Sequence, residues 1–213
     1  LRPMTGTRSR FAALHIGGSS AILAGIVIAE IGVLGGWPAL AFSGFIVGAI
    51  GALAYLIDLA DVFRRATTPH VQPQLLMVFG ALCSFVAMLV AASAMLGKDV
   101  GAAAVYVALI GWVGSAVIAH LHHLGVRLLL TIVRGDDDET RPWEVLTPHL
   151  TWLTVALYIA AVVLGALALN LHHFAYLEIA AICGILAWIV MVVNVTRAYR
   201  VAQSQGVQSH SLV

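Results

Sequence analysis

Charged side chains are scarce in this sequence. Asp, Glu, Lys and Arg make up 10% of the 213 residues, whereas 61% are hydrophobic. A soluble domain carries about 25% charged residues, because it faces water on all sides. The composition therefore excludes a disordered tail, a nucleic-acid-binding module and a cytosolic enzyme. It indicates an integral membrane protein whose main partner is the lipid bilayer.

Cysteine, lysine and the common catalytic motifs are also nearly absent. Cys83 and Cys183 lie inside apolar runs without a CxxC pair, which argues against a disulfide scaffold and a cysteine-based zinc site. Lys98 is the single lysine and lies in a turn, which argues against a retinal protein. HExxH, GxSxG and P-loop patterns are missing. The first apolar segment is too long for the apolar core of a signal peptide, so we expect no signal peptide.

Six apolar stretches are long enough to cross a membrane as helices, which takes about 20 residues each. They cover about residues 12–35, 39–60, 74–96, 101–133, 149–169 and 175–197. Spans through lipid must satisfy their backbone hydrogen bonds internally. The sequence therefore predicts an all-α fold, with one integral membrane domain over residues 1–213 built as a six-helix bundle.

The arginines fall on one side of this bundle. Every arginine lies near a terminus or near the second or fourth break between spans, whereas Lys98 lies in the third break, on the opposite side. Positively charged residues flank the cytoplasmic ends of membrane helices. We therefore expect a multi-pass protein of the cell membrane whose N- and C-termini are both cytoplasmic.

Glycines recur at small-residue spacing in the second and fourth spans, at Gly44, Gly48 and Gly51 and at Gly111 and Gly114. Small residues let helix backbones approach closely, so we interpret them as packing positions. The alternative interpretation is room for a flat cofactor.

A Thr-Pro-His sequence opens both the third span, at residues 68–70, and the fifth, at residues 147–149. Threonine is a frequent N-cap, and proline is frequent at the first helical position, which accounts for the first two residues. The repeated histidine leaves a duplication of helix pairs as an alternative to coincidence.

Histidine is frequent in this sequence, with nine residues in all. An imidazole inside a membrane is costly unless a partner satisfies it, so such residues are functional candidates. Imidazole is also a common metal ligand and ligates haem iron. Four predicted helices carry candidates, which favours a cofactor site in the bundle core. These candidates are His15, His70, His120, His122, His123 and His149.

The spacing in the fourth span restricts what its histidines can bind together. His120 and His122 project about 200° apart on an α-helix, so they cannot chelate one ion but could serve two centres. His123 lies on the face of His120. One ion could bridge this second pair, or one histidine could orient the other.

The stretch Ala119-His120-Leu121-His122-His123-Leu124-Gly125 resembles the ligand helix of haem-copper oxidases, especially the C-family and nitric-oxide-reductase branch. NnrS-type membrane haem proteins are a further group that it resembles. In the oxidase helix an H-x-H pair supplies axial ligands to a low-spin and a high-spin haem. The resemblance implies that His120 and His122 are haem ligands. Gly125, residues 128–133 and His149 fit the order of the family, in which the position of His149 is not a ligand.

The depth of this stretch in the bilayer has two solutions. The fourth span is about 50 Å long at 1.5 Å per residue, which exceeds the thickness of a bilayer core. Counting from Gly101 puts His120 near the cytoplasmic face. Counting back from Arg134 puts it in the outer half, where the family keeps its haems, and buries Arg127, which would suit haem propionates.

Two carboxylates near the inner end of the second span suggest a different site. Asp58 and Asp61 are three residues apart and share one helix face. Together with His15, His70 and His149 they could form an oxygen-and-nitrogen site for iron, zinc or manganese. The alternative is an ion pair between Asp61 and Arg64 or Arg65. The full set of candidate metal ligands is His120, His122, His123, Asp58 and Asp61.

The first functional hypothesis is a redox protein for electron transfer that holds b-type haem. His120 and His122 would ligate the haem, and His15, His70, His149 and Arg127 would surround it. Its partners would be redox subunits or a quinone. The alternatives are a small transporter or channel for protons or metal ions, and a non-haem oxidoreductase that uses iron, copper or zinc. The sequence leaves open whether the chain is an enzyme, a homo-oligomer or a subunit of a larger complex.

Overall fold

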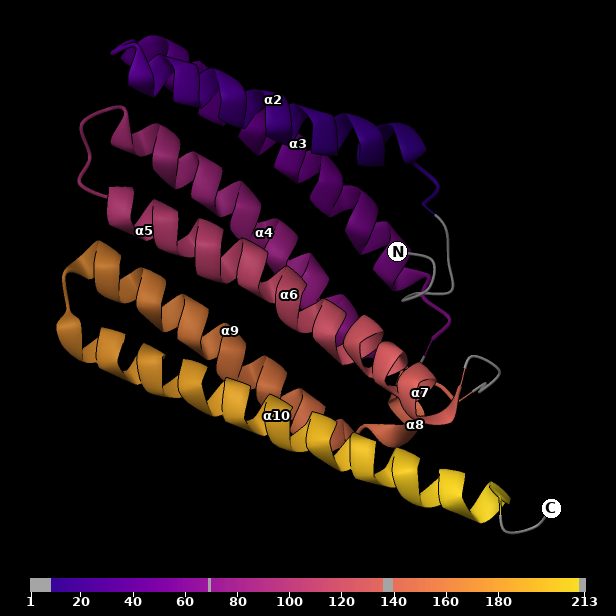
Figure 1. The fold of residues 1–213 in the computed structure, drawn as a ribbon. Helices are drawn as coiled ribbons and strands as arrows, with labels where there is room; N and C mark the ends of the chain where they lie inside the picture. Colours follow the sequence, from indigo (N-terminus) through magenta and orange to yellow (C-terminus); the bar gives the residue numbers. More distant parts are fainter. Residues whose placement is uncertain (1–8, 69, 136–139, 211–213) are drawn as a thin grey trace.

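Six long helices run side by side in alternating directions (Figure 1). The computed structural model describes residues 9–68, 70–135 and 140–210. Within these residues six helices are long and apolar enough to cross a membrane, and no strand is present. The predicted all-α fold is confirmed. The helices are α2 (Ala12–Leu34), α3 (Pro38–Arg64), α4 (Val71–Ala94), a fourth helix over Gly101–Arg134, α9 (Pro148–Leu171) and α10 (Phe174–His210).

Two features of the helix boundaries differ from the prediction. The α10 helix continues to His210, well past the predicted span. A short helix, α8 (Pro142–Val145), lies in the break before α9. Hydropathy marks where a chain leaves the lipid, and a helix can continue past that point through polar residues. The sequence pattern therefore located the spans but not the ends of the helices outside them.

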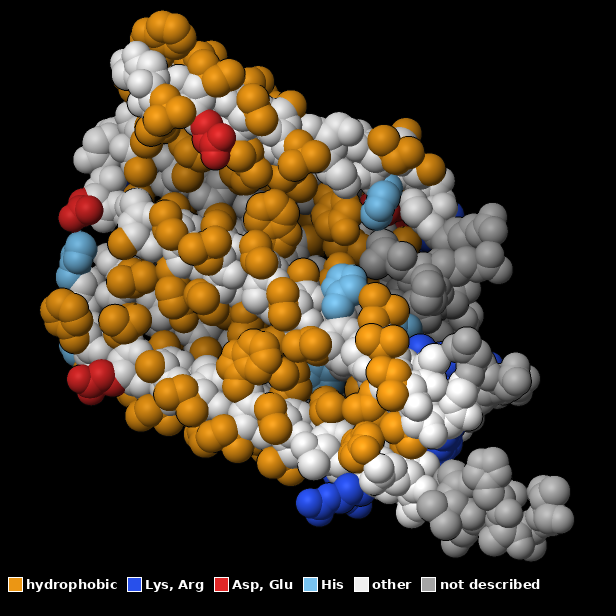
Figure 2. All heavy atoms as spheres, viewed as in Figure 1, with side chains coloured by type: hydrophobic (Ala, Val, Ile, Leu, Met, Phe, Trp, Pro, Cys, Tyr) orange, Lys and Arg blue, Asp and Glu red, His pale blue; other side chains and the backbone are white. Residues whose placement is uncertain are grey.

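Apolar side chains cover much of the face of the bundle that Figure 2 shows. Leu34, Phe174 and Ile132 are 88%, 79% and 76% exposed, far more than a large apolar side chain would be in a soluble core. An exposed apolar surface of this extent needs an apolar solvent. The chain is therefore a multi-pass membrane protein, and its outer surface faces lipid.

The two ends of the bundle differ in charge. The start of α2 and the end of α10 lie at the same end (Figure 1), and blue side chains gather toward this end on the face in Figure 2. Lys98 and Asp99 lie in the turn at the opposite end. We call the first of these the arginine end, and its described arginines are Arg10, Arg64, Arg65, Arg127, Arg134, Arg141, Arg197 and Arg200.

Glycine allows α2 and α3 to pack backbone against backbone. A Cβ atom built on Gly18 would lie 2.8 Å from the carbonyl oxygen of Gly51, and one on Gly25 would lie 2.6 Å from that of Gly44. Real Cβ atoms do not approach this closely, so the two helices meet where side chains are absent. The space beside Gly44 and Gly51 is filled by α2, in agreement with the packing interpretation.

The fourth helix contains two π-helical stretches. It consists of α5 (Gly101–Tyr106), η1 (Val107–Gly114), α6 (Ser115–His120), η2 (Leu121–Gly125) and α7 (Val126–Arg134). A π-helical turn is wider than an α-helical turn and is frequent at functional sites. The hydroxyl of Tyr158 in α9 donates to the carbonyl of Ile110 within η1. The hydroxyl of Tyr106 donates to the carbonyl of Ala161 at 2.9 Å, so two bonds join the fourth helix to α9.

The two Thr-Pro-His sequences adopt different local structures. Thr147 is the N-cap of α9 and Pro148 is its first residue, as predicted, although the threonine side chain makes no capping hydrogen bond. The α4 helix begins at Val71 with His70 as its N-cap, so the prediction that Thr68 is the N-cap is wrong. The Oγ1 of Thr68 instead accepts a hydrogen bond from Gln74, at 2.7 Å. His70 is buried and His149 is exposed, so the two sequences occupy unlike environments.

We predict that Gly25→Leu destabilises the protein by about 3 kcal/mol, at the upper end of the usual cost of overpacking. The new side chain would meet the backbone of α3, which has no side-chain freedom to relieve the clash. Reversible unfolding in mixed micelles would measure the loss. Gly17→Ala is the matched control, because nothing lies within 4 Å of its Cβ position. Equal stability of the two variants would contradict the prediction.

Candidate functional site

Three histidines meet inside the bundle near the arginine end. His70 precedes α4, and His122 and His123 lie in η2 of the fourth helix. Their exposed fractions are 3%, 0% and 5%. The ring centroids of His70 and His123 are 6.0 Å apart. We call these three residues the buried histidine cluster.

Trp143 of α8 closes one side of the cluster. Its ring lies 6.0 Å from that of His70 and 6.5 Å from that of His123, and it is nearly parallel to the His123 ring. The guanidinium of Arg141 lies 5.4 Å from the centroid of the Trp143 ring, in a cation–π contact. The short helix that hydropathy did not reveal therefore separates the cluster from the end of the bundle.

The contact between His123 and His70 fixes the level of the histidine motif along the bundle. His70 immediately precedes α4, so His123 lies level with the start of that helix and near the arginine end. This agrees with the count from Gly101 and not with the count back from Arg134. The remaining residues of the fourth helix extend past the cluster. There Arg127 donates to the carbonyl of Thr140, and Arg134 donates to the Thr140 hydroxyl.

Backbone carbonyls fix the tautomers of His120 and His122. The Nδ1 of His120 lies 2.7 Å from the carbonyl oxygen of Ala116, and the Nδ1 of His122 lies 3.0 Å from that of Ile118. A carbonyl oxygen only accepts, so each neutral ring carries its hydrogen on Nδ1 and its lone pair on Nε2. Histidines that ligate metals commonly have their second nitrogen bonded in this way.

Several nitrogens of the cluster lack hydrogen-bond partners. In the described part of the chain, the Nε2 of His122 and both ring nitrogens of His70 have none. Buried polar groups in folded proteins are nearly always paired, because an unpaired one costs about 1–3 kcal/mol. The cluster therefore offers unused lone pairs in an apolar interior, which is the chemistry of a ligand site.

The electrostatics of the cluster keep His70 neutral. Burial, followed by the nearby His123 and His122 side chains, lowers the pKa of His70 from its ordinary value of 6.5 to about 3. A neutral imidazole is the form that ligates metals, because its lone pair is not taken up by a proton. His70 therefore remains a competent ligand across the physiological pH range.

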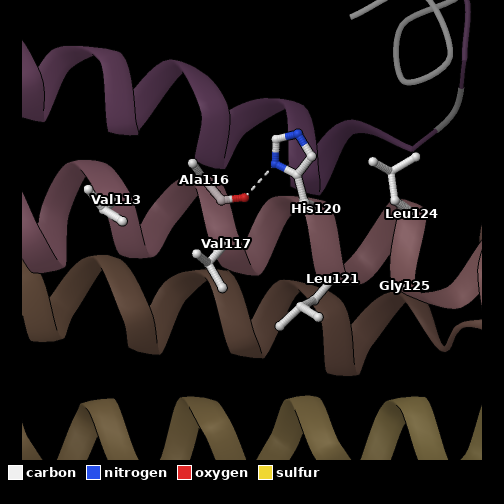
Figure 3. A pocket seen from close by; sticks show the side chains of 7 residues that line it. All are labelled: Val113, Ala116, Val117, His120, Leu121, Leu124 and Gly125. Carbon is white, nitrogen blue, oxygen red and sulfur yellow. Dashed lines mark hydrogen bonds between the residues drawn. The ribbon is translucent and has the colours of Figure 1, made fainter.

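His120 lies outside this cluster, on the outer face of the fourth helix. It is exposed and lines a shallow hollow of about 420 Å³, in which it is the one polar side chain (Figure 3). His122 is fully buried. The two histidines thus lie on different sides of the helix, as their spacing predicts, and they do not share one centre.

The carboxylates of α3 lie elsewhere and have partners of their own. Asp58 is fully buried, where it accepts hydrogen bonds from the Ser9 hydroxyl and from the Nδ1 of His15, the latter at 3.0 Å. Asp61 pairs with Arg65, whose Nε lies 3.0 Å from its carboxylate. This is the ion pair that the sequence offered as an alternative to a metal site. The structure brings His15 of α2 and Asp58 of α3 together, as a pair separate from the buried histidine cluster.

A bare metal ion finds no complete ligand set in the described residues. Within them, no group of three or more His, Cys, Asp or Glu side chains lies close enough to hold one. His149 is exposed on α9 and takes no part in the cluster. Asp61 has its arginine partner instead. The candidate ligands are thus divided between the buried cluster, the His120 hollow and the His15–Asp58 pair.

Sequence reasoning missed two features of the site. One is Trp143, whose only signal was an aromatic residue in a polar loop beside a proline. The other is the π-helical turn η2, which spans Leu121–Gly125 and so contains His122 and His123. The sequence motif located the site. Only the structure shows that His122 and His123 are buried while His120 lies on the outer face.

Comparisons of the chain with protein-family models, with curated proteins and with solved structures gave no match. The similarity of residues 119–125 to the ligand helix of haem-copper oxidases therefore stays a prediction.

We predict that the buried His70 makes the protein less stable in acid. Folded His70 remains neutral below pH 6.5, whereas the unfolded residue takes up a proton, so stability falls as the pH drops from about 6.5 to about 3. His70→Leu should flatten this dependence by up to about 1.4 kcal/mol per pH unit. Chemical unfolding in detergent at several pH values would measure it. His149→Leu is the control and should keep the wild-type slope; an unchanged slope in His70→Leu would refute the prediction.

Proposed function

We propose that the protein is a membrane-embedded haem-binding redox protein, in which His122 would hold the haem iron. The observation that carries the proposal is the Nε2 of His122, which is buried and has no hydrogen-bond partner. The bond from Nδ1 to the Ile118 carbonyl fixes the tautomer of the ring, so this Nε2 carries a lone pair. Neutral His70 lies in the same cluster and supplies further unpaired nitrogens. Haem iron accepts one or two such ligands and supplies one-electron redox chemistry when bound.

The ligand count favours haem over a bare ion. A structural or catalytic metal ion takes at least three protein ligands, whereas haem supplies four nitrogens of its own. The cluster consists of imidazoles, and no group of three or more His, Cys, Asp or Glu side chains among the described residues could hold a metal ion. Arg127 lies five residues beyond His122, and its guanidinium is of the kind that pairs with a carboxylate such as a haem propionate.

The orientation follows from the arginine end. Arginines gather at the end that holds both described termini, while Lys98 lies at the other. From the positive-inside rule we infer that the arginine end is cytoplasmic, and this orientation would put the buried histidine cluster toward the cytoplasmic side of the cell membrane.

We predict that His122→Leu loses haem. Wild-type protein expressed with added haem precursor should show a Soret band and a reduced α band, and the variant should retain about a tenth of the haem or less. His122→Met should retain haem with a shifted spectrum, because a thioether also ligates haem iron. His149→Leu is the matched control and should bind as wild type. Wild-type protein without iron or a Soret band would overturn the proposal, and iron without a Soret band would favour a non-haem oxidoreductase.

We also predict that Lys98→Cys reacts with a membrane-impermeant maleimide in intact cells, whereas Ser204→Cys reacts only after lysis. Each residue lies at one end of the bundle, and Ser204 is exposed. Cys183 is only partly exposed on α10, and Cys183→Ala removes it from the background. The reverse labelling pattern would refute the orientation.

A further inference from the structure

The hollow beside His120 opens on the outer surface of the bundle. It is lined by residues spaced three or four apart along one face of the fourth helix (Figure 3). Its volume of about 420 Å³ lies within the range of small-molecule sites, which is about 300–1,000 Å³. The small residues Ala116 and Gly125 help to form the depression. Its remaining walls are Val113, Val117, Leu121 and Leu124.

His120 is the single polar side chain in this lining, and its chemistry is fixed. Its Nδ1 donates to the Ala116 carbonyl, so its Nε2 is a hydrogen-bond acceptor and not a donor. No described residue supplies a donor to that nitrogen. The walls around it are apolar and offer no donor, and an unsatisfied polar group in apolar surroundings is costly. The hollow therefore matches a largely apolar molecule that carries one hydroxyl group.

The hollow lies close to the proposed haem ligand. His120 and His122 are two residues apart on opposite faces of the same helix. His120 lies about 4.5 Å further along the helix from the arginine end than His123, at 1.5 Å per residue. A molecule in the hollow would thus be separated from the buried histidine cluster by the fourth helix alone.

We propose that this hollow is a binding site for the reduced form of a lipid-soluble quinone, whose phenolic hydroxyl donates to the Nε2 of His120. The choice of a redox-active ligand rests on the proposed haem function, for which a quinol would be the electron donor in the membrane. The apolar walls receive the ring and the start of its tail. The fixed tautomer of His120 gives the site a preference, because a quinol has hydroxyl donors and a quinone has only acceptors.

The test is the preference between the two redox states. Protein in quinone-free phosphatidylcholine nanodiscs is titrated anaerobically with radiolabelled duroquinol, with empty nanodiscs as background. Unlabelled duroquinone and the dimethyl ether of duroquinol then compete for the site. We expect duroquinol to bind about tenfold more tightly than either competitor, which corresponds to about 1.4 kcal/mol. Equal affinity of duroquinol and duroquinone would overturn the proposal.

Variants assign the preference to His120. His120→Leu keeps the apolar wall and removes the acceptor, so duroquinol affinity should fall about tenfold to that of duroquinone. Gly125→Leu should weaken both ligands, because its side chain fills the hollow and its Cβ meets only the Leu121 side chain, 3.5 Å away. His149→Leu is the matched control and should change neither affinity. A preference that survives in His120→Leu would overturn the proposal.

Absorption spectra of the same variants separate this inference from the proposed function. Because the binding assay does not use haem, wild-type protein without haem that prefers duroquinol through His120 would refute the haem function alone. Loss of the Soret band in His120→Leu, with haem retained in His122→Leu, would make His120 the haem ligand and overturn the quinol site. Val117→Cys disulfide dimers formed in nanodiscs from the Cys183→Ala background would place a second copy on the hollow, which would also overturn it.

Discussion

The lack of water inside a bilayer is the constraint on which this structure depends. Every polar group within the lipid must find its partner in the protein or in a bound molecule. Several buried polar side chains in the described part of the chain meet this demand. Asn194 bonds to the backbone of Thr147 and to the Thr151 hydroxyl, and Asp58 holds Ser9 and His15. Both ring nitrogens of His70 and the Nε2 of His122 lack such a partner, which is why they mark the site.

The local winding of the fourth helix determines where His120 and His122 lie. His120 ends α6 and is exposed on the outer surface, whereas His122 lies in η2 and is buried in the interior. Each ring is anchored by the carbonyl four residues earlier. The same helix thus sets two different surroundings for one chemical group. The inner imidazole, that of His122, is fully buried, whereas the outer one, that of His120, lines an apolar hollow.

The sequence predicted the spans well because length and hydropathy alone determine what crosses a bilayer. It also located the histidine-rich segment, and it offered the Asp61–Arg65 pair, which is local in the chain. It could not assign the depth of His120, since that depends on the contact between His123 and His70, residues far apart in sequence. The same limit applies to the Thr-Pro-His repeats, where one histidine is buried and the other exposed. Trp143 reaches the site because the loop before α9 forms a short helix, which the hydropathy pattern does not predict.

The residues of the buried histidine cluster come from separate parts of the chain, and this determines when during synthesis the cluster can form. His70 comes before the third helix, His122 and His123 lie in the fourth, and Trp143 follows it. Asn194 of the last helix then fixes Thr147, four residues after Trp143. During synthesis the surroundings of the cluster are therefore complete only when the final helix has entered the membrane. Any group that the cluster holds is loaded into a nearly complete protein, and it cannot serve as the template around which the first helices insert.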